Sequence, residues 1–208
     1  MRNEYRLVVV SGPSGSGKDT VVSQLIRRRQ DIRLSVSCTT RKPRPKEKEG
    51  IDYYFLNEQQ FEQRIADGDM LEYTRYDGNY YGTPMHEIEQ KLSDDTTVVL
   101  IIEVTGAKNV KNVCPDSLCI FIVPPSLETL EQRLRARSTE SEQEISRRLE
   151  IAARELQELK FYDYAIKNET AAECSSKLES IIEEWQEMYK DIQHSWKTIE
   201  KDEDEIYD

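Results

Sequence analysis

Apolar residues gather along this chain in short runs rich in β-branched side chains, with longer amphipathic stretches between them. The runs lie at residues 5–10, 34–38, 96–104, 118–123 and 164–166. Because they do not alternate with polar residues, they predict strands buried on both faces, as in a parallel sheet. Helical periodicity follows the first run at residues 18–29 and recurs later. The pattern predicts an α/β fold, in which a parallel sheet core is flanked by helices.

Two stretches interrupt this alternation. Residues 39–86 begin with a basic, proline-broken segment and include an Asp-Gly-Asn turn at 77–79, so they predict an inserted lobe with β structure. Residues 126–159 carry two apolar stripes at helical spacing. Between the stripes, Ser141 and Glu144 have the spacing of a capping box, which restarts a helix. We expect a helical hairpin there.

The C-terminal part has one long helical pattern, from Asn168 to about Ile199, followed by the acidic run EKDEDEIYD. A dense run of like charges at a chain end is typical of a solvated tail. We expect this tail to be frayed and to have no catalytic part.

Composition narrows the classes of partner. The formal net charge of −11 disfavours non-specific binding to nucleic acid or to an anionic membrane. No apolar segment approaches the ~20 residues that span a bilayer, and the N-terminus lacks the features of a signal peptide. We therefore expect a cytoplasmic protein. The four cysteines form no CxxC pair and the two histidines are far apart, which favours structural thiols over a metal or redox site.

A glycine-rich loop follows the first predicted strand. Gly12, Gly17 and Lys18 have the spacing of G-x-x-x-x-G-K, directly before a predicted helix. Such a loop wraps its backbone N–H groups around phosphate oxygens, and its lysine reaches the outer phosphates. The alternative is an ordinary strand-to-helix turn with an exposed lysine. The context favours an ATP site made of Gly12, Pro13, Ser14, Gly15, Ser16, Gly17, Lys18, Asp19 and Thr20.

Asp19 stands where such a loop usually carries the Ser or Thr that helps to hold Mg²⁺. An aspartate binds the metal directly or through a water, but it adds negative charge near the triphosphate. Thr20 still offers a hydroxyl group. We expect an intact phosphate cradle with an altered metal shell in which Asp19 takes part.

Three longer stretches resemble guanylate kinases: SVSCTTRKPRPKEKEGIDYYF, LEYTRYDGNYYGTP and PPSLETLEQRLRARSTESEQEISRRL. The resemblance covers about residues 6–185. It implies transfer of the terminal phosphoryl group of ATP to GMP with Mg²⁺, and the substrates ATP and GMP as partners. It also implies a core at about 1–36, 87–125 and 160–190, a GMP-binding lobe at about 37–86 and a lid at about 126–159. Residues 191–208 would form the helix end and tail, and the chain would be a monomer or homodimer.

The resemblance assigns the GMP site residue by residue. Arg41, Arg44, Tyr53 and Tyr81 match the phosphate ligands; Glu72 and Glu103 match the acceptors for guanine; Ser37 and Thr83 match hydroxyls on the same base. Arginine forks suit a phosphate dianion, and two acceptors distinguish guanine from adenine. Taken singly, Tyr80 and Tyr81 could simply pack a hairpin and the basic segment could be a solvated loop.

On the ATP side, Arg137 and Arg148 match lid arginines and Asn168 matches an adenine contact. Lys18, Arg41, Arg137 and Arg148 would be the catalytic set, acting by charge on the transferring group. Arg133 and Arg147 are less certain neighbours. The alternative is that the arginines are surface residues paired with Glu140, Glu144 or Glu150.

Two further departures from the family pattern are Ile101, where an acid usually supports Mg²⁺, and Ser138, where the lid usually has glycine. Asp19 could partly replace the acid missing at Ile101. Two rival functions stay open: a non-catalytic module that holds phosphorylated peptides, and a kinase for another small phosphorylated acceptor. The second would not require Ser37, Glu72, Thr83 and Glu103.

Overall fold

A computed structural model describes residues 6–92, 96–136 and 141–206, with 189–206 described by their backbone alone. Its centre is a five-stranded parallel sheet in the order β2-β7-β1-β8-β9. The strands are β1 (Leu7–Ser11), β2 (Ile32–Leu34), β7 (Thr97–Ile101), β8 (Leu118–Val123) and β9 (Tyr164–Lys167). The expected parallel sheet core is confirmed.

Both faces of this sheet are covered, as the unalternating strands predict. Val8 and Val10 of β1 face one apolar cluster, which contains α1 (Lys18–Arg28) and the first half of α7 (Ala171–Ile206). Leu7 and Val9 face the other cluster, with α3 (Met85–Lys91), α4 (Val104–Val113) and the short 3₁₀ helix η1 (Leu159–Phe161). Each strand therefore buries alternate residues in opposite layers.

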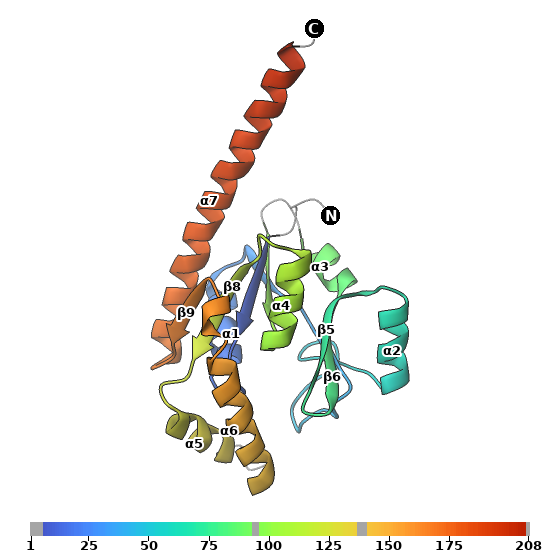
Figure 1. Cartoon of the computed structure of the whole chain (residues 1–208), viewed down its shortest axis with the longest axis vertical. Coiled ribbons are helices and arrows are strands. Elements are labelled where there is room, and N and C mark those ends of the chain that lie inside the picture. Colours follow the sequence, from blue (N-terminus) through green and yellow to red (C-terminus); the bar gives the residue numbers. More distant parts are fainter. Residues whose placement is uncertain (1–5, 93–95, 137–140, 207–208) are drawn as a thin grey trace.

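The inserted lobe is a separate four-stranded mixed sheet, in the order β4-β3-β6-β5. Its strands are β3 (Cys38–Thr39), β4 (Tyr54–Phe55), β5 (Met70–Tyr76) and β6 (Asn79–Pro84), and α2 (Glu58–Ala66) lies between β4 and β5. The hairpin turns at Asp77 and Gly78, whose φ angles of 50° and 80° suit the tight two-residue turn that the sequence predicts. Figure 1 shows this lobe to one side of the core.

The predicted helical hairpin consists of α5 (Leu127–Arg135) and α6 (Glu142–Leu156). Ser126 caps α5, and Ser141 with Glu144 forms the expected capping box at the start of α6. The hairpin has its own small apolar cluster, made of Leu130, Leu134, Ile145 and Ala152.

Some predicted boundaries are wrong. The run at residues 34–38 is not one strand. The Ser35 N–H donates to the Val99 carbonyl of β7 at 3.0 Å, but the next N–H, that of Val36, donates to the Glu87 carboxylate at 2.8 Å instead of to a strand. The run at 96–104 also ends early, since α4 begins at Val104. The last helix continues to Ile206 instead of ending near Ile199, because no proline or glycine interrupts it.

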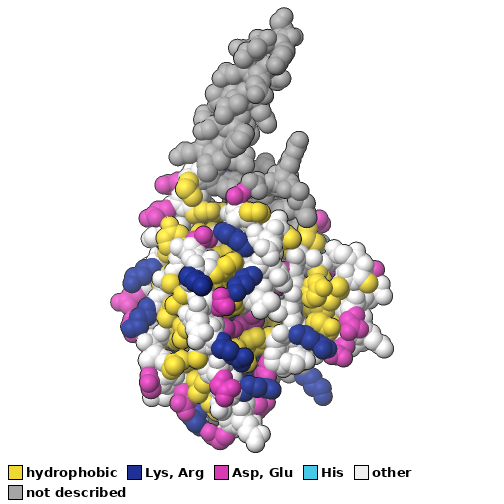
Figure 2. All heavy atoms as spheres, in the orientation of Figure 1, with side chains coloured by type: hydrophobic (Ala, Val, Ile, Leu, Met, Phe, Trp, Pro, Cys, Tyr) yellow, Lys and Arg dark blue, Asp and Glu magenta, His cyan; other side chains and the backbone are white. Residues whose placement is uncertain are grey.

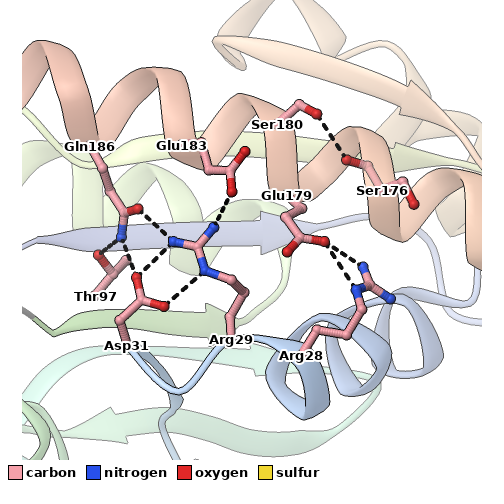
Figure 3. A network of polar contacts seen from close by, with 9 residues as sticks. All are labelled: Arg28, Arg29, Asp31, Thr97, Ser176, Glu179, Ser180, Glu183 and Gln186. Atoms are coloured by element: carbon pink, nitrogen blue, oxygen red, sulfur yellow. Dashed lines mark hydrogen bonds and ion pairs between the residues drawn. The ribbon is translucent and has the colours of Figure 1, made fainter.

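A polar network holds α7 against the core (Figure 3). Arg29 donates two hydrogen bonds to Asp31, at 2.8 and 2.7 Å, and a third to Glu183 at 2.7 Å. Gln186 donates to Thr97 Oγ1 at 2.8 Å and so reaches the start of β7. The upper part of α7 projects beyond the rest of the molecule (Figure 1). No helix in the described part of the chain is long and apolar enough to cross a membrane.

Candidate functional site

A cavity of about 510 Å³ lies between the core, the inserted lobe and the helical hairpin. The carboxyl end of β7 opens into it, which is where ligands bind in open α/β sheets. It is lined by most of the predicted site residues, which are Ser14, Gly15, Lys18, Asp19, Ser37, Arg41, Arg44, Tyr53, Glu72, Tyr81, Glu103 and Arg148. Residues spread over most of the sequence therefore share one site.

The phosphate loop joins β1 to α1 as expected. A Cβ at Gly12 would lie 2.4 Å from the Ile122 carbonyl oxygen, and the φ of Gly12 is 150°, so only glycine fits there. The Lys18 ammonium is buried and donates to the Gly12 carbonyl at 3.0 Å. This hydrogen bond holds the Lys18 side chain against the backbone of the phosphate loop. Pro13, Ser16 and Gly17 complete the loop, while Thr20 is exposed on α1.

Two side chains fix the second half of the loop. Asn168, just after β9, donates from Nδ2 to the Ser16 carbonyl at 2.7 Å. Arg133 of α5 donates to the same carbonyl at 3.3 Å. The Asn168 amide thus binds the loop backbone, and its contact with adenine stays a prediction. Arg133 contacts the loop as well, so it is more than a surface residue.

Glu72 lies at the base of the cavity, on β5 of the inserted lobe. Thr83 Oγ1 donates to Glu72 Oε1 at 2.8 Å, and both side chains are buried. Burial raises the pKa of Glu72 to about 7, although the Thr83 hydrogen bond opposes this shift. Gly106 of α4 makes room for the carboxylate, because a Cβ there would lie 2.6 Å from Glu72 Oε2.

Glu103 also lines this cavity, at the start of α4. Its neighbour is Glu155, which is buried on α6. Burial, the charge of Glu103 and a hydrogen bond with Glu103 raise the pKa of Glu155 to about 8, while Lys18 opposes the shift. Burial and the charge of Glu103 therefore favour the neutral form of the Glu155 carboxyl group.

Arg41 and Arg44 lie together at the outer end of the cavity. Glu47 is between them: its carboxylate accepts from Arg41 Nη2 at 2.8 Å and is 3.7 Å from Arg44 Nη1. The Arg41 guanidinium also lies 5.5 Å from the centre of the Tyr53 ring, and the Tyr53 and Tyr81 rings are 6.1 Å apart in an edge-on arrangement. The predicted phosphate ligands thus form one cluster around a carboxylate.

Asp19 is exposed at the start of α1 and faces the cavity. Burial raises the pKa of the Tyr53 hydroxyl, and the charge of Asp19 raises it further. Ile101 also lines the cavity and offers no oxygen. Among the described residues, no group of three or more His, Cys, Asp or Glu side chains could hold a metal ion by itself.

Arg148 of α6 lines the cavity. Its Nη1 donates to Ser14 Oγ of the phosphate loop at 2.8 Å, and its Nη2 lies 3.8 Å from Asp77 Oδ2. Glu144, one of the alternative partners, accepts instead from the backbone N–H of Ser141 in the capping box. Arg137, Ser138 and Glu140 lie outside the described residues.

Sequence reasoning missed several residues of the site, or gave them a smaller part. Glu155 could have been found by helical spacing, since it lies two turns after Arg148 on the same face of α6. Asp77 was expected only as a turn residue. No pattern in the sequence indicates the other missed residues, which are Ser35, Glu47, Tyr76 and Gly106.

Comparison with known proteins decides the family. The model of the family described as guanylate kinase matches residues 4–185. The chain belongs to the guanylate kinase family. It is 45% identical to a guanylate kinase of Latilactobacillus sakei, over 88% of this chain and 91% of that one. It is 46% identical to a guanylate kinase of Clostridioides difficile, over 85% of this chain and 86% of that one.

Solved structures agree. The fold is similar to the crystal structure of guanylate kinase from Anaplasma phagocytophilum, with a TM-score of 0.71, 32% sequence identity and coverage of 88% of this chain and 87% of that one. The match to the guanylate kinase family extends through the core, the inserted lobe and the helical hairpin, so it includes every element that lines the cavity. Hereafter the inserted lobe is called the GMP lobe and the helical hairpin the lid, the names that the resemblance implied for them.

Proposed function

We propose that this member of the guanylate kinase family transfers the γ-phosphoryl group of ATP to GMP, giving ADP and GDP. The observation that supports it most is the pair of carboxylates, Glu72 and Glu103, that line one cavity together with the phosphate loop. A guanine base presents two N–H donors on one edge, and an adenine base does not. Two acceptors opposite a phosphate cradle therefore suit a guanine nucleotide better than an adenine nucleotide at the acceptor site.

The residues divide by the substrate that each would bind. Backbone N–H groups of Gly12–Lys18 would hold the phosphates of ATP, with Lys18 leaving the Gly12 carbonyl for the outer phosphates. Arg41, Arg44, Tyr53 and Tyr81 would bind the GMP phosphate, and Ser37 and Thr83 would contact the base or its carboxylate partner. Incoming phosphate would displace Glu47 from Arg41, because both anions use the same guanidinium donors.

The reaction needs no protein nucleophile. An oxygen of the GMP phosphate attacks the γ-phosphorus of ATP in line, the bond to the β–γ bridging oxygen breaks, and ADP leaves with that electron pair. Lys18 and the lid arginines Arg148 and Arg137 would neutralise the charge on the transferring group. Closure of the lid over the loop and the lobe would exclude water, so that ATP is not hydrolysed instead.

The donor set of the cavity fits Mg²⁺ bound together with nucleotide. Mg²⁺ in nucleotide sites takes one or two protein carboxylates and completes its shell with phosphate oxygens and waters. Asp19 is an exposed carboxylate beside the loop, and Ile101 offers no second one. We therefore assign the protein contact with the metal to Asp19, where the bound ion would offset phosphate charge.

The test is a coupled assay of ADP formation from ATP and Mg²⁺, with GMP, AMP, CMP and UMP offered separately. We expect turnover with GMP alone, and a loss of at least about 10³-fold in kcat in Lys18→Ala, because no other side chain reaches the outer phosphates in the same way. Turnover with another phosphorylated acceptor in place of GMP would contradict the proposal that GMP is the acceptor. GMP binding without any turnover would make the cavity a recognition site only.

A further inference from the structure

The tip of the GMP-lobe hairpin carries a carboxylate that its turn does not need. Asp77 has a φ of 50°, and Asn or Gly satisfies such a position at least as well as Asp. A side chain at a hairpin tip is normally solvated, yet the Asp77 carboxylate is only 13% exposed. Something outside the hairpin covers it.

The cover is the lid helix α6. Arg147 forms an ion pair with Asp77 Oδ1, and Arg148 Nη2 lies 3.8 Å from Asp77 Oδ2. Arg148 is itself only 12% exposed, and its other terminal nitrogen donates to Ser14 Oγ at 2.8 Å. A continuous polar chain therefore joins the GMP lobe, the lid and the phosphate loop through one guanidinium group.

This arrangement gives Asp77 a role in placing Arg148. An arginine with a carboxylate on one side and the phosphate loop on the other has its fork oriented before substrate arrives, which lowers the cost of fixing the side chain. The carboxylate lies on the lobe that would take GMP, and Ser14 lies on the loop that would take ATP. We propose that Asp77 is a positioning residue that couples the two nucleotide sites through Arg147 and Arg148, which rests on the proposed function for the identity of the two ligands.

The test measures coupling directly. The dissociation constant of GMP is measured by calorimetry with and without a saturating non-hydrolysable ATP analogue and Mg²⁺, in the unmodified chain and in Asp77→Asn. Asparagine keeps the turn and the side-chain size but loses the charge. We expect the analogue to tighten GMP binding about fivefold or more in the unmodified chain, and the factor to approach one in Asp77→Asn.

Matched controls separate coupling from loss of charge or of structure. Arg147→Gln removes the exposed half of the contact and should reproduce the loss of coupling. Asp67→Asn removes a charge from the same lobe, where the Asp67 carboxylate accepts from the Gln63 side chain. Arg154→Gln removes a charge from α6. Both variants should keep the full coupling factor.

Three results would overturn the inference. One is coupling in Asp77→Asn equal to that of the unmodified chain. The second is no coupling in the unmodified chain. The third is an equal loss in Asp67→Asn. Because binding is measured, the result is independent of turnover, so a failure of the phosphoryl-transfer assay and a failure of this inference are distinguishable.

Discussion

Glu72 is the acceptor that we propose for guanine, and its burial in the cavity shifts its ionisation. Its pKa is raised to about 7 by burial, so a fraction of the carboxyl groups is protonated and unable to accept from guanine near neutral pH. The Thr83 hydroxyl limits this shift by donating to the ionised form. Base recognition should therefore depend on pH in a range where an ordinary glutamate is fully ionised.

We expect kcat/KM for GMP to fall about tenfold between pH 8 and pH 6, because a raised pKa means that the accepting form is lost as pH decreases through 7. The GMP phosphate, with a second pKa of about 6, contributes its own part. Glu72→Gln should keep the pH dependence that comes from the GMP phosphate and lose the pH dependence that comes from Glu72. Its kcat/KM at pH 8 should also be lower. Identical pH slopes in both proteins would contradict this assignment.

Asp19 and Ile101 bear on how the protein would hold Mg²⁺, because the Asp19 side chain offers an oxygen and the Ile101 side chain offers none. We expect Asp19→Ala to raise the Mg²⁺ concentration needed for half-maximal turnover about tenfold, since the remaining contacts to the metal would be phosphates and waters. Asp52→Ala, which also removes a carboxylate from the cavity wall, serves as the control. An unchanged Mg²⁺ dependence in Asp19→Ala would show that Asp19 does not support the metal.

At the scale of elements, α7 is fastened to the core by charge as well as by apolar contact. The hydrogen bonds from Arg29 lower the pKa of Asp31 to about 2. Because the pKa is lowered, the ionised Asp31 stabilises the fold at every pH above the unfolded pKa of about 4, and this stabilisation is lost as the pH falls from 4 to 2. The pair is partly exposed, so solvent screening keeps its contribution small.

Asp31→Asn should therefore lower the free energy of unfolding by about 0.5–1 kcal/mol at pH 7, and the difference from the unmodified chain should vanish near pH 2. Urea unfolding at several pH values measures this. Glu183→Gln, which pairs with the same Arg29 at a more exposed position, should have a smaller effect. A constant difference across the pH range would mean that the ionised carboxylate is not what stabilises the contact.

The elements that the sequence predicts best are those with a strong period and clear ends. The strand at 118–123 and the capping box at Ser141 match the structure, because an unbroken apolar run and a local cap depend on neighbours in sequence. The run at 34–38 misled because its last residues bond to Glu87 and to the GMP lobe. Local pattern cannot show when a distant side chain takes over a backbone N–H.

At the scale of the whole molecule, the layout of three lobes and most of the cavity lining followed from motif order. The contacts between lobes did not follow from motif order. They join residues that share no period or motif, namely Asp77 with Arg147 and Glu103 with Glu155. Figure 2 shows why net charge predicts little about such contacts: on the face shown, acidic and basic side chains are interspersed. The net charge of −11 affects the long-range attraction of charged partners, whereas the contacts within the site depend on individual ion pairs.

The central position of β1 has a consequence for synthesis of the chain. Leu7–Ser11 leaves the ribosome before its two neighbours in the sheet, which are residues 97–101 and 118–123. At about 5–20 residues per second, roughly 5–20 s pass before both neighbours are made. During that delay the nascent chain exposes a strand that the finished protein buries completely. The folding yield in a cell should therefore depend on how well chaperones protect this strand.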